Sequence, residues 1–133
     1  MTNQSDELRT AAAHPMVGVG MPAALHLDAF GREINDAFGH LPYLVGTAAY
    51  GKQWRDVDVR LILPDDEFDA LFPKPTEPGQ PDGRWDLLCA ALSELARQRT
   101  GLPVDFQIQR QSYANDRFPG ARHALGLHDR NGQ

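Results

Sequence analysis

Three aspartates lie in segments whose other residues are typical of β-strands. Asp56 and Asp58 are two residues apart at the start of an alternating segment, and Asp105 lies in a similar segment further along the chain. Aspartate is depleted in strands, so each placement carries a local cost. Because residues two apart in a strand share a face, Asp56 and Asp58 should project side by side, and Asp105 joins them if its strand is a neighbour.

Carboxylates gathered in this way repel one another unless a cation lies among them. A hard divalent ion suits oxygen ligands, and Mg²⁺ in particular combines one or two carboxylates with the phosphates of a substrate. The sequence therefore predicts a site for Mg²⁺, or for Mn²⁺ in its place, at Asp56, Asp58 and Asp105.

A simpler interpretation is that these aspartates belong to a solvated face of a sheet. Antiparallel sheets often direct apolar residues to the core and polar residues to water in alternation. Arg60, two residues after Asp58, could also neutralise the aspartates without a metal ion. On the aspartates alone, this interpretation has more support than a metal site.

A glycine–threonine pair upstream favours the metal site. The apolar run at 41–45, which we interpret as a buried strand, leads directly into Gly46 and Thr47. Glycine allows a phosphate to approach the backbone, and a hydroxyl beside a helix start offers a donor to its oxygens. The pair alone would fit any strand-to-helix turn. A more specific signal is the order of three features along the chain: this pair, then a strand that starts with Asp-Val-Asp, and then Asp105 on a later strand.

Hydrophobic periodicity predicts the elements that would position these residues. Apolar residues at helical spacing indicate one amphipathic helix over 27–38 and another between Asp82 and Gly101. Alternation indicates strands over 56–63 and 104–109, in addition to the apolar run described above. The apolar stripe of the second helix consists of Trp85, Leu88, Leu92, Leu95 and Ala96. We therefore predict an α/β (α+β) fold, with a small mixed sheet backed by two main helices.

The length of 133 residues fits one domain. We predict a flexible N-terminal tail over residues 1–20, a single domain over 21–127 and a frayed C-terminus over 128–133. Shorter helical turns are expected after the glycine–threonine pair, after Pro64 and near 113–118. These turns would connect the strands and the main helices.

Composition limits the partners and the compartment. Thirteen Lys and Arg against eighteen Asp and Glu give a net charge of -5, so no broad binding of nucleic acid is expected. Cys89 is the single cysteine, which excludes an internal disulfide and fits a reducing cytoplasm. No apolar run approaches the roughly 18 residues that span a bilayer, so we expect a cytoplasmic protein with no membrane partner.

This combination of motifs resembles the nucleotidyltransferase superfamily, which has the DNA polymerase β-like fold. The family pattern is a strand ending in Gly-Ser, a short helix, a strand opening Asp-x-Asp and a third Asp on a later strand. The matching segments here are LVGT at 44–47, DVDVRLIL at 56–63 and VDFQI at 104–108. The chain also looks like a small uncharacterised group of bacterial and phage-type proteins that share RDVDVR and VDFQIQRQ.

The resemblance implies a nucleotidyltransferase-like core and a specific reaction. A nucleoside monophosphate would pass from a nucleoside triphosphate to an unknown acceptor (a protein, an RNA or a small molecule), with pyrophosphate leaving. Asp56 and Asp58 would hold two Mg²⁺ ions and the triphosphate. Asp105 would bind the catalytic metal and help to activate the attacking hydroxyl. Gly46 and Thr47 would cradle the phosphates.

The sequence also departs from the family pattern. Thr47 replaces the usual serine, Arg55 replaces the common serine before the first aspartate, and Arg60 could take the place of a metal ion. Lys52 and Arg55 could contact the phosphates, although basic residues in a loop are usually only solvated. The loop before Asp56 is short, and no second domain for an acceptor is obvious. These departures favour an alternative: a catalytically silent interaction module on the same fold, such as a toxin–antitoxin-like or phage regulatory protein.

Overall fold

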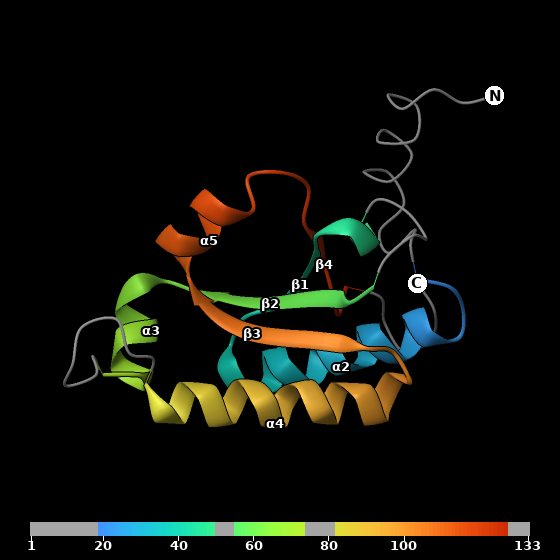
Figure 1. Ribbon diagram of the computed structural model, residues 1–133, viewed down its shortest axis with the longest axis horizontal. Helices are drawn as coiled ribbons and strands as arrows, with labels where there is room; N and C mark the ends of the chain where they lie inside the picture. Colours follow the sequence, from blue (N-terminus) through green and yellow to red (C-terminus); the bar gives the residue numbers. More distant parts are fainter. Residues whose placement is uncertain (1–18, 50–54, 74–81, 128–133) are drawn as a thin grey trace.

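The computed structural model describes residues 19–49, 55–73 and 82–127, apart from the side chain of Thr47. A mixed four-stranded sheet with the order β3-β2-β1-β4 lies at its centre (Figure 1). Strand β1 is antiparallel to both β2 and β4, whereas β2 and β3 are parallel. The strands are β1 Tyr43–Val45, β2 Val57–Leu63, β3 Val104–Arg110 and β4 His123–Ala124. The predicted α/β class with a mixed sheet is confirmed.

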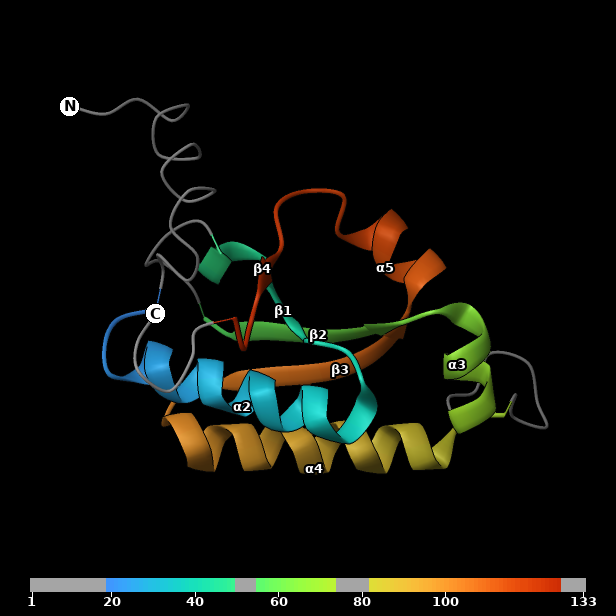
Figure 2. The ribbon, with the colours of Figure 1, turned by 180° about the vertical axis from the view of Figure 1, so that it is seen from behind.

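Helices flank both sides of this sheet. Helices α2 and α4 lie side by side against one face, and the 3₁₀ helix η1 and helix α5 lie beyond the other (Figures 1 and 2). Helix α3 lies beside the end of β2 (Figure 1). The helices are α2 Ala23–Phe38, η1 Thr47–Ala49, α3 Asp65–Leu71, α4 Gly83–Thr100 and α5 Gln111–Arg117. The two main helices predicted from the sequence are therefore α2 and α4.

The hydrophobic core lies between the sheet and these two helices. Alternate residues of the central strands are fully buried, namely Val57, Val59, Leu61, Leu63, Val104, Phe106 and Ile108. The ring of Phe106 meets the ring of Phe30 from α2 edge to face, with 5.8 Å between centroids. Burial of such aromatic and branched side chains is the main favourable contribution to folding. Because the period of a strand is two, the residues between them face the opposite side.

Helix α2 is longer than predicted and closely contacts Leu125, the residue after β4. It begins at Ala23, four residues before the predicted start at Leu27. Val19 is buried in the same core, so packing extends into the stretch predicted as a tail. A Cβ atom on Gly31 would lie 2.6 Å from the backbone of Leu125. This close approach is the reason for a glycine in the middle of the helix, where it costs about 1 kcal/mol relative to alanine.

Helix α4 begins and ends where the sequence indicates, but its buried side is wider than the predicted stripe. The side chain of Asp82 accepts hydrogen bonds from the first turn, and Gly101 ends the helix with a φ of 72°. The predicted apolar stripe packs against the core: Ala96 is fully buried, and Trp85, Leu88, Leu92 and Leu95 are partly buried. The buried side also includes Cys89, Ser93 and Thr100, which lie beside the stripe and were not predicted to face the core.

The free edge of β3 explains this wider buried side. An edge strand leaves backbone groups unpaired, and α4 supplies side chains that pair them. Ser93 Oγ accepts from Phe106 N at 2.9 Å and donates to Phe106 O at 3.2 Å. Trp85 Nε1 donates to Ile108 O at 2.7 Å, and Arg97 Nε donates to Val104 O at 3.1 Å. These bonds turn the polar side chains of α4 toward the strand.

Two further details differ from the sequence prediction. Strand β2 begins at Val57, whose N–H donates to the carbonyl of Pro103, so Asp56 lies at a bend before the strand and not within it. Strand β4 was not predicted, because its two residues carry no periodic pattern. None of the described helices has the length and apolar character needed to cross a bilayer.

Candidate functional site

Asp58 and Asp105 lie opposite each other on neighbouring strands. They are register partners in the parallel pairing of β2 with β3. Their strand neighbours are buried against α2 and α4, so both carboxylates face the other side of the sheet. The side chain of Asp58 is 27% exposed and that of Asp105 is 41% exposed. The predicted adjacency of these two aspartates is confirmed.

A glycine bend lies directly against Asp58. The antiparallel pairing of β1 with β2 places Val45 opposite Asp58, and Gly46 follows. Gly46 has a φ of 73°, in the left-handed region, and a Cβ atom on it would lie 2.6 Å from Asp58 Oδ2. Both the backbone conformation and the contact therefore require glycine. Thr47 begins η1, and its side chain lies outside the described part of the chain.

Arg60 lies between the two carboxylates. Its Nη2 is 3.2 Å from Asp105 Oδ2 and 3.7 Å from Asp58 Oδ1. Its Nη1 donates to the backbone carbonyls of Asp105 at 2.6 Å and Val59 at 3.1 Å. The ring of Phe118 lies 5.6 Å from the guanidinium carbon. The arginine that the sequence placed on this face therefore forms ion pairs with both aspartates.

The charges at this point do not balance. Burial raises the pKa of Asp58 above its usual value of 3.8; Arg60 opposes this shift, while Asp105 and Asp56 add to it. One guanidinium faces two carboxylates, so a net negative charge remains on a partly buried surface. Such a surface attracts a further cation.

The same face of the sheet holds buried polar atoms that lack partners. Arg60 Nε and Gln109 Oε1 are buried with no hydrogen-bond partner among the described residues. The amide of Gln109 donates to Gln107 Oε1 at 3.2 Å on the same strand. An unpaired buried polar group typically costs about 1–3 kcal/mol. Uncompensated costs of this kind are concentrated at functional sites more often than in structural cores.

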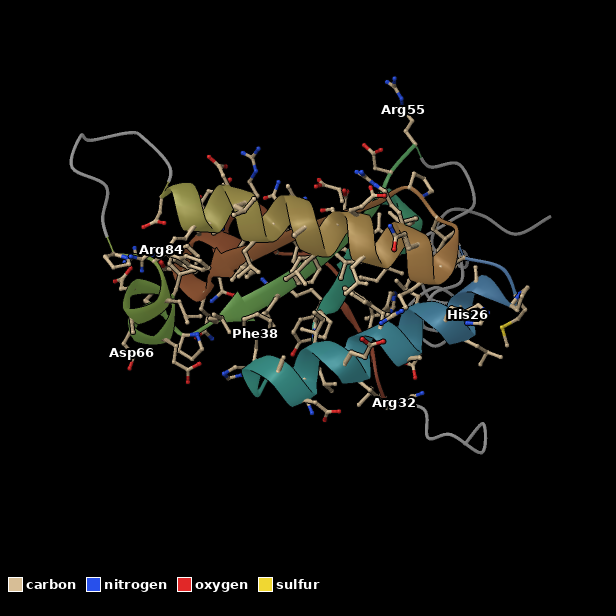
Figure 3. The ribbon with its side chains drawn as sticks, turned by 90° about the horizontal axis from the view of Figure 1, so that it is seen from below. His26, Arg32, Phe38, Arg55, Asp66 and Arg84 are labelled. Atoms are coloured by element: carbon tan, nitrogen blue, oxygen red, sulfur yellow. The ribbon has the colours of Figure 1, made fainter. Side chains whose placement is uncertain are left out.

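The other predicted site residues do not join this group. Asp56 is exposed at the bend before β2, although its charge still raises the pKa of Asp58. Arg55 is exposed, and its side chain extends away from the body of the protein (Figure 3). Lys52 lies outside the described residues. Within the part of the chain that the structure describes, no group of three or more His, Cys, Asp or Glu side chains is arranged to hold a metal ion.

The donor set nevertheless fits one Mg²⁺ ion with a phosphate-bearing substrate. Mg²⁺ usually binds through one or two carboxylates and completes its shell with phosphates and water. Asp58 and Asp105 provide two carboxylates, and the two oxygens of Asp58 face different neighbours. Oδ1 faces Arg60, whereas Oδ2 faces the bend at Gly46. The oxygen beside the bend is therefore the one that does not face the arginine.

A shallow, open pocket that sequence reasoning missed adjoins this face. It measures about 470 Å³ and lies between α5 and the segment that leads to β4. Its lining residues are Asn115, Phe118, Pro119, Gly120 and Arg122. Phe118 connects the pocket to the guanidinium of Arg60. The sequence gives no motif for it, because its walls come from an irregular segment whose path depends on β4.

Comparison of the chain with protein-family models, with curated proteins and with solved structures found no significant match. The features of this site are two opposed carboxylates, a glycine bend against one of them, and an arginine that pairs with both.

Proposed function

We propose that this protein is a Mg²⁺-dependent nucleotidyltransferase with a nucleotidyltransferase-like core. The observation that carries the proposal is the position of Asp58 opposite Asp105 beside the bend at Gly46. The order of elements supports it: a short strand runs into a glycine, a 3₁₀ helix follows, and the next strand starts after Asp56. This order agrees with the pattern of the superfamily that the sequence resembles.

Each residue has a defined role in this proposal. Asp58 and Asp105 would hold the divalent ion, which when bound offsets the charge that develops on the phosphates. The backbone at Gly46 would leave room for the triphosphate. Asp105 is the more exposed carboxylate and would orient the acceptor hydroxyl. The acceptor oxygen would then bond to the α-phosphorus as the bond to pyrophosphate breaks, and the hydroxyl proton would pass to the Asp105 carboxylate and from there to solvent.

Several parts of the proposal rest on the sequence alone. Contacts of Thr47, Lys52, Arg55 and Asp56 with the triphosphate stay predictions, as does the acceptor, which could be a protein, an RNA or a small molecule. The net charge of -5 argues against broad binding of nucleic acid. A cytoplasmic location is proposed from the single cysteine.

Release of pyrophosphate tests the proposal directly. Wild-type protein should release pyrophosphate from at least one of the four common nucleoside triphosphates with Mg²⁺ and a panel of hydroxyl acceptors. Asp58→Asn should abolish this release, because it removes a metal ligand while preserving shape. Asp69→Asn is the matched control, since Asp69 pairs with Arg110 on another part of the sheet. Equal turnover in wild type and Asp58→Asn, or no turnover under any condition, would contradict the proposal.

A second candidate is a catalytically silent interaction module on the same fold. The contacts of Arg60 with both aspartates favour it, because the arginine already supplies a positive charge there. Calorimetric titration with Mg²⁺ and Mn²⁺, in the presence and absence of nucleotide, separates the two candidates. Binding only in the presence of nucleotide supports the transferase, and no binding in either condition supports the silent module.

A further inference from the structure

Arg60 is held in place by more than its charge. Its side chain is only 7% exposed, and Nη1 donates to two backbone carbonyls, those of Val59 and Asp105. Phe118 covers the guanidinium from the side of α5. An arginine fixed by backbone bonds and a ring cannot swing away as a solvated side chain would.

A purely structural role explains this arrangement poorly. Burying a guanidinium is expensive, and the attraction of a partner repays it only when the remaining donors are also satisfied. Arg60 Nε has no partner among the described residues, and the charge is divided between two carboxylates at 3.2 and 3.7 Å. An apolar residue here, with uncharged residues at Asp58 and Asp105, would avoid these costs.

We propose that Arg60 is a positioning residue that acts as a built-in counter-cation, competing with a divalent ion for Asp58 and Asp105. The free protein then binds metal weakly, and the ion enters together with a nucleotide that brings its own phosphate ligands. This inference rests on the proposed function, because it assumes that the two aspartates are metal ligands. The inference explains why an arginine occupies position 60, which the family pattern does not explain.

The charge of the cluster predicts how the affinity for a divalent ion should change when Arg60 is replaced. With Arg60 present the cluster of Asp58, Asp105 and Arg60 carries one net negative charge, and without it two. Attraction of a divalent ion at contact distance scales with that charge in a medium of low dielectric constant. We therefore expect that a neutral side chain at position 60 increases the affinity for Mn²⁺ in the absence of nucleotide by at least about tenfold.

Titration of Mn²⁺ followed by electron paramagnetic resonance provides the test, since the signal of free Mn²⁺ falls as the ion binds. Each titration with nucleotide is compared with the same titration without protein, because the nucleotide itself binds Mn²⁺. The proteins compared are wild type, Arg60→Met, Arg60→Lys and Arg110→Met, each with and without a non-hydrolysable ATP analogue. Arg60→Lys keeps the charge and should remain close to wild type. Arg110→Met removes an arginine that pairs with Asp69 away from the site and should also match wild type. Arg60→Gln, which keeps a donor for the Asp105 carbonyl, replaces Arg60→Met if the latter fails to fold by circular dichroism.

The outcomes separate this inference from the proposed function. Tighter Mn²⁺ binding by the neutral variant, with Arg60→Lys and Arg110→Met unchanged, supports it. Equal or weaker binding by a folded neutral variant, while wild type binds Mn²⁺ with the ATP analogue, overturns the inference and leaves the proposed function intact. If no protein binds Mn²⁺ even with the analogue, both are overturned.

Discussion

Two arginines of the parallel strands β2 and β3 pair with aspartates and lie over phenylalanine rings, but the two clusters differ in burial and in charge balance. Arg110, at the end of β3, pairs with the single carboxylate of Asp69 from α3 through two nitrogens. Both side chains are well exposed, at 37% and 42%. Arg60 is buried, faces two carboxylates and leaves Nε without a partner among the described residues.

We interpret the difference as that between a structural ion pair and the site of the proposed function. Arg110 and Asp69 match in charge and geometry, and they connect a short helix to the end of a strand. Exposed pairs of this kind contribute little to stability. The cluster of Arg60, Asp58 and Asp105 has an excess of negative charge in a partly buried position. A buried cluster with an unpaired polar atom and an unbalanced charge is typical of a ligand-binding site.

The largest expected effect comes from breaking the buried cluster. In metal-free buffer, Arg60→Met should lower the free energy of unfolding by about 3 kcal/mol, because it leaves two partly buried carboxylates unopposed. Arg110→Met should cause a much smaller loss. Chemical denaturation followed by circular dichroism measures both. Equal losses in the two variants would show that the clusters do not differ as described.

The next effect comes from the glycine bend and has a matched control. Gly46 and Gly101 have nearly the same φ, 73° and 72°, but nothing lies within 4 Å of a Cβ atom on Gly101. Alanine at either position should cost about 1–2 kcal/mol of backbone strain. Gly46→Ala should also displace Asp58 and abolish Mn²⁺ binding with ATP, which calorimetry can measure. If Gly46→Ala still binds Mn²⁺ with ATP, the bend at Gly46 is not part of the binding site.

A smaller effect concerns the pH dependence of stability. Because the pKa of Asp58 is raised in the folded state, the folded protein binds this proton more tightly than the unfolded chain. Ionisation of Asp58 therefore costs stability as the pH rises from below 3.8 through the raised pKa. Asp58→Asn should melt at a higher temperature than wild type at neutral pH. The difference in melting temperature should shrink as the pH falls below 3.8, where Asp58 is protonated in both states. A difference that instead grows on acidification would contradict the assigned shift.

The smallest effect concerns the side chains that bond the edge of β3. Burial raises the pKa of the Cys89 thiol, and Ile108 N donates to its sulfur at 3.5 Å. A buried thiol with a raised pKa reacts slowly, because the thiolate is the nucleophile. Mass spectrometry should find Cys89 unmodified by iodoacetamide in the native protein and modified in denaturant. Rapid native labelling would show that α4 separates readily from β3.

Sequence reasoning succeeded where a feature depends on local pattern. A period of two places Asp58 and Asp105 on the polar side of their strands, and the parallel register then brings them together. Asp82 and Gly101 delimit α4 because a side-chain cap and a left-handed residue act within one turn. Gly46 was recognised because a small residue after an apolar strand indicates a bend.

Sequence reasoning failed where a feature depends on residues that are distant in the chain. Asp56 was assigned to a strand, but the ladder begins at Val57 because Pro103 supplies the first partner. The buried side of α4 follows hydrogen bonds from Ser93 to the edge of β3, and a count of apolar residues contains no information about them. The pocket beside Phe118 depends on β4, which exists only through its pairing with β1.

Binding of Mn²⁺ with a non-hydrolysable ATP analogue, measured by calorimetry in wild type and Asp105→Asn, tests whether Asp58 and Asp105 together hold a divalent ion. Asp105 is the residue whose position opposite Asp58 depends entirely on the fold. We predict saturable binding of Mn²⁺ with the analogue in wild type. This binding should be lost in Asp105→Asn, whose circular dichroism spectrum should match that of wild type. Identical binding in the two proteins, or none in wild type, would contradict this prediction.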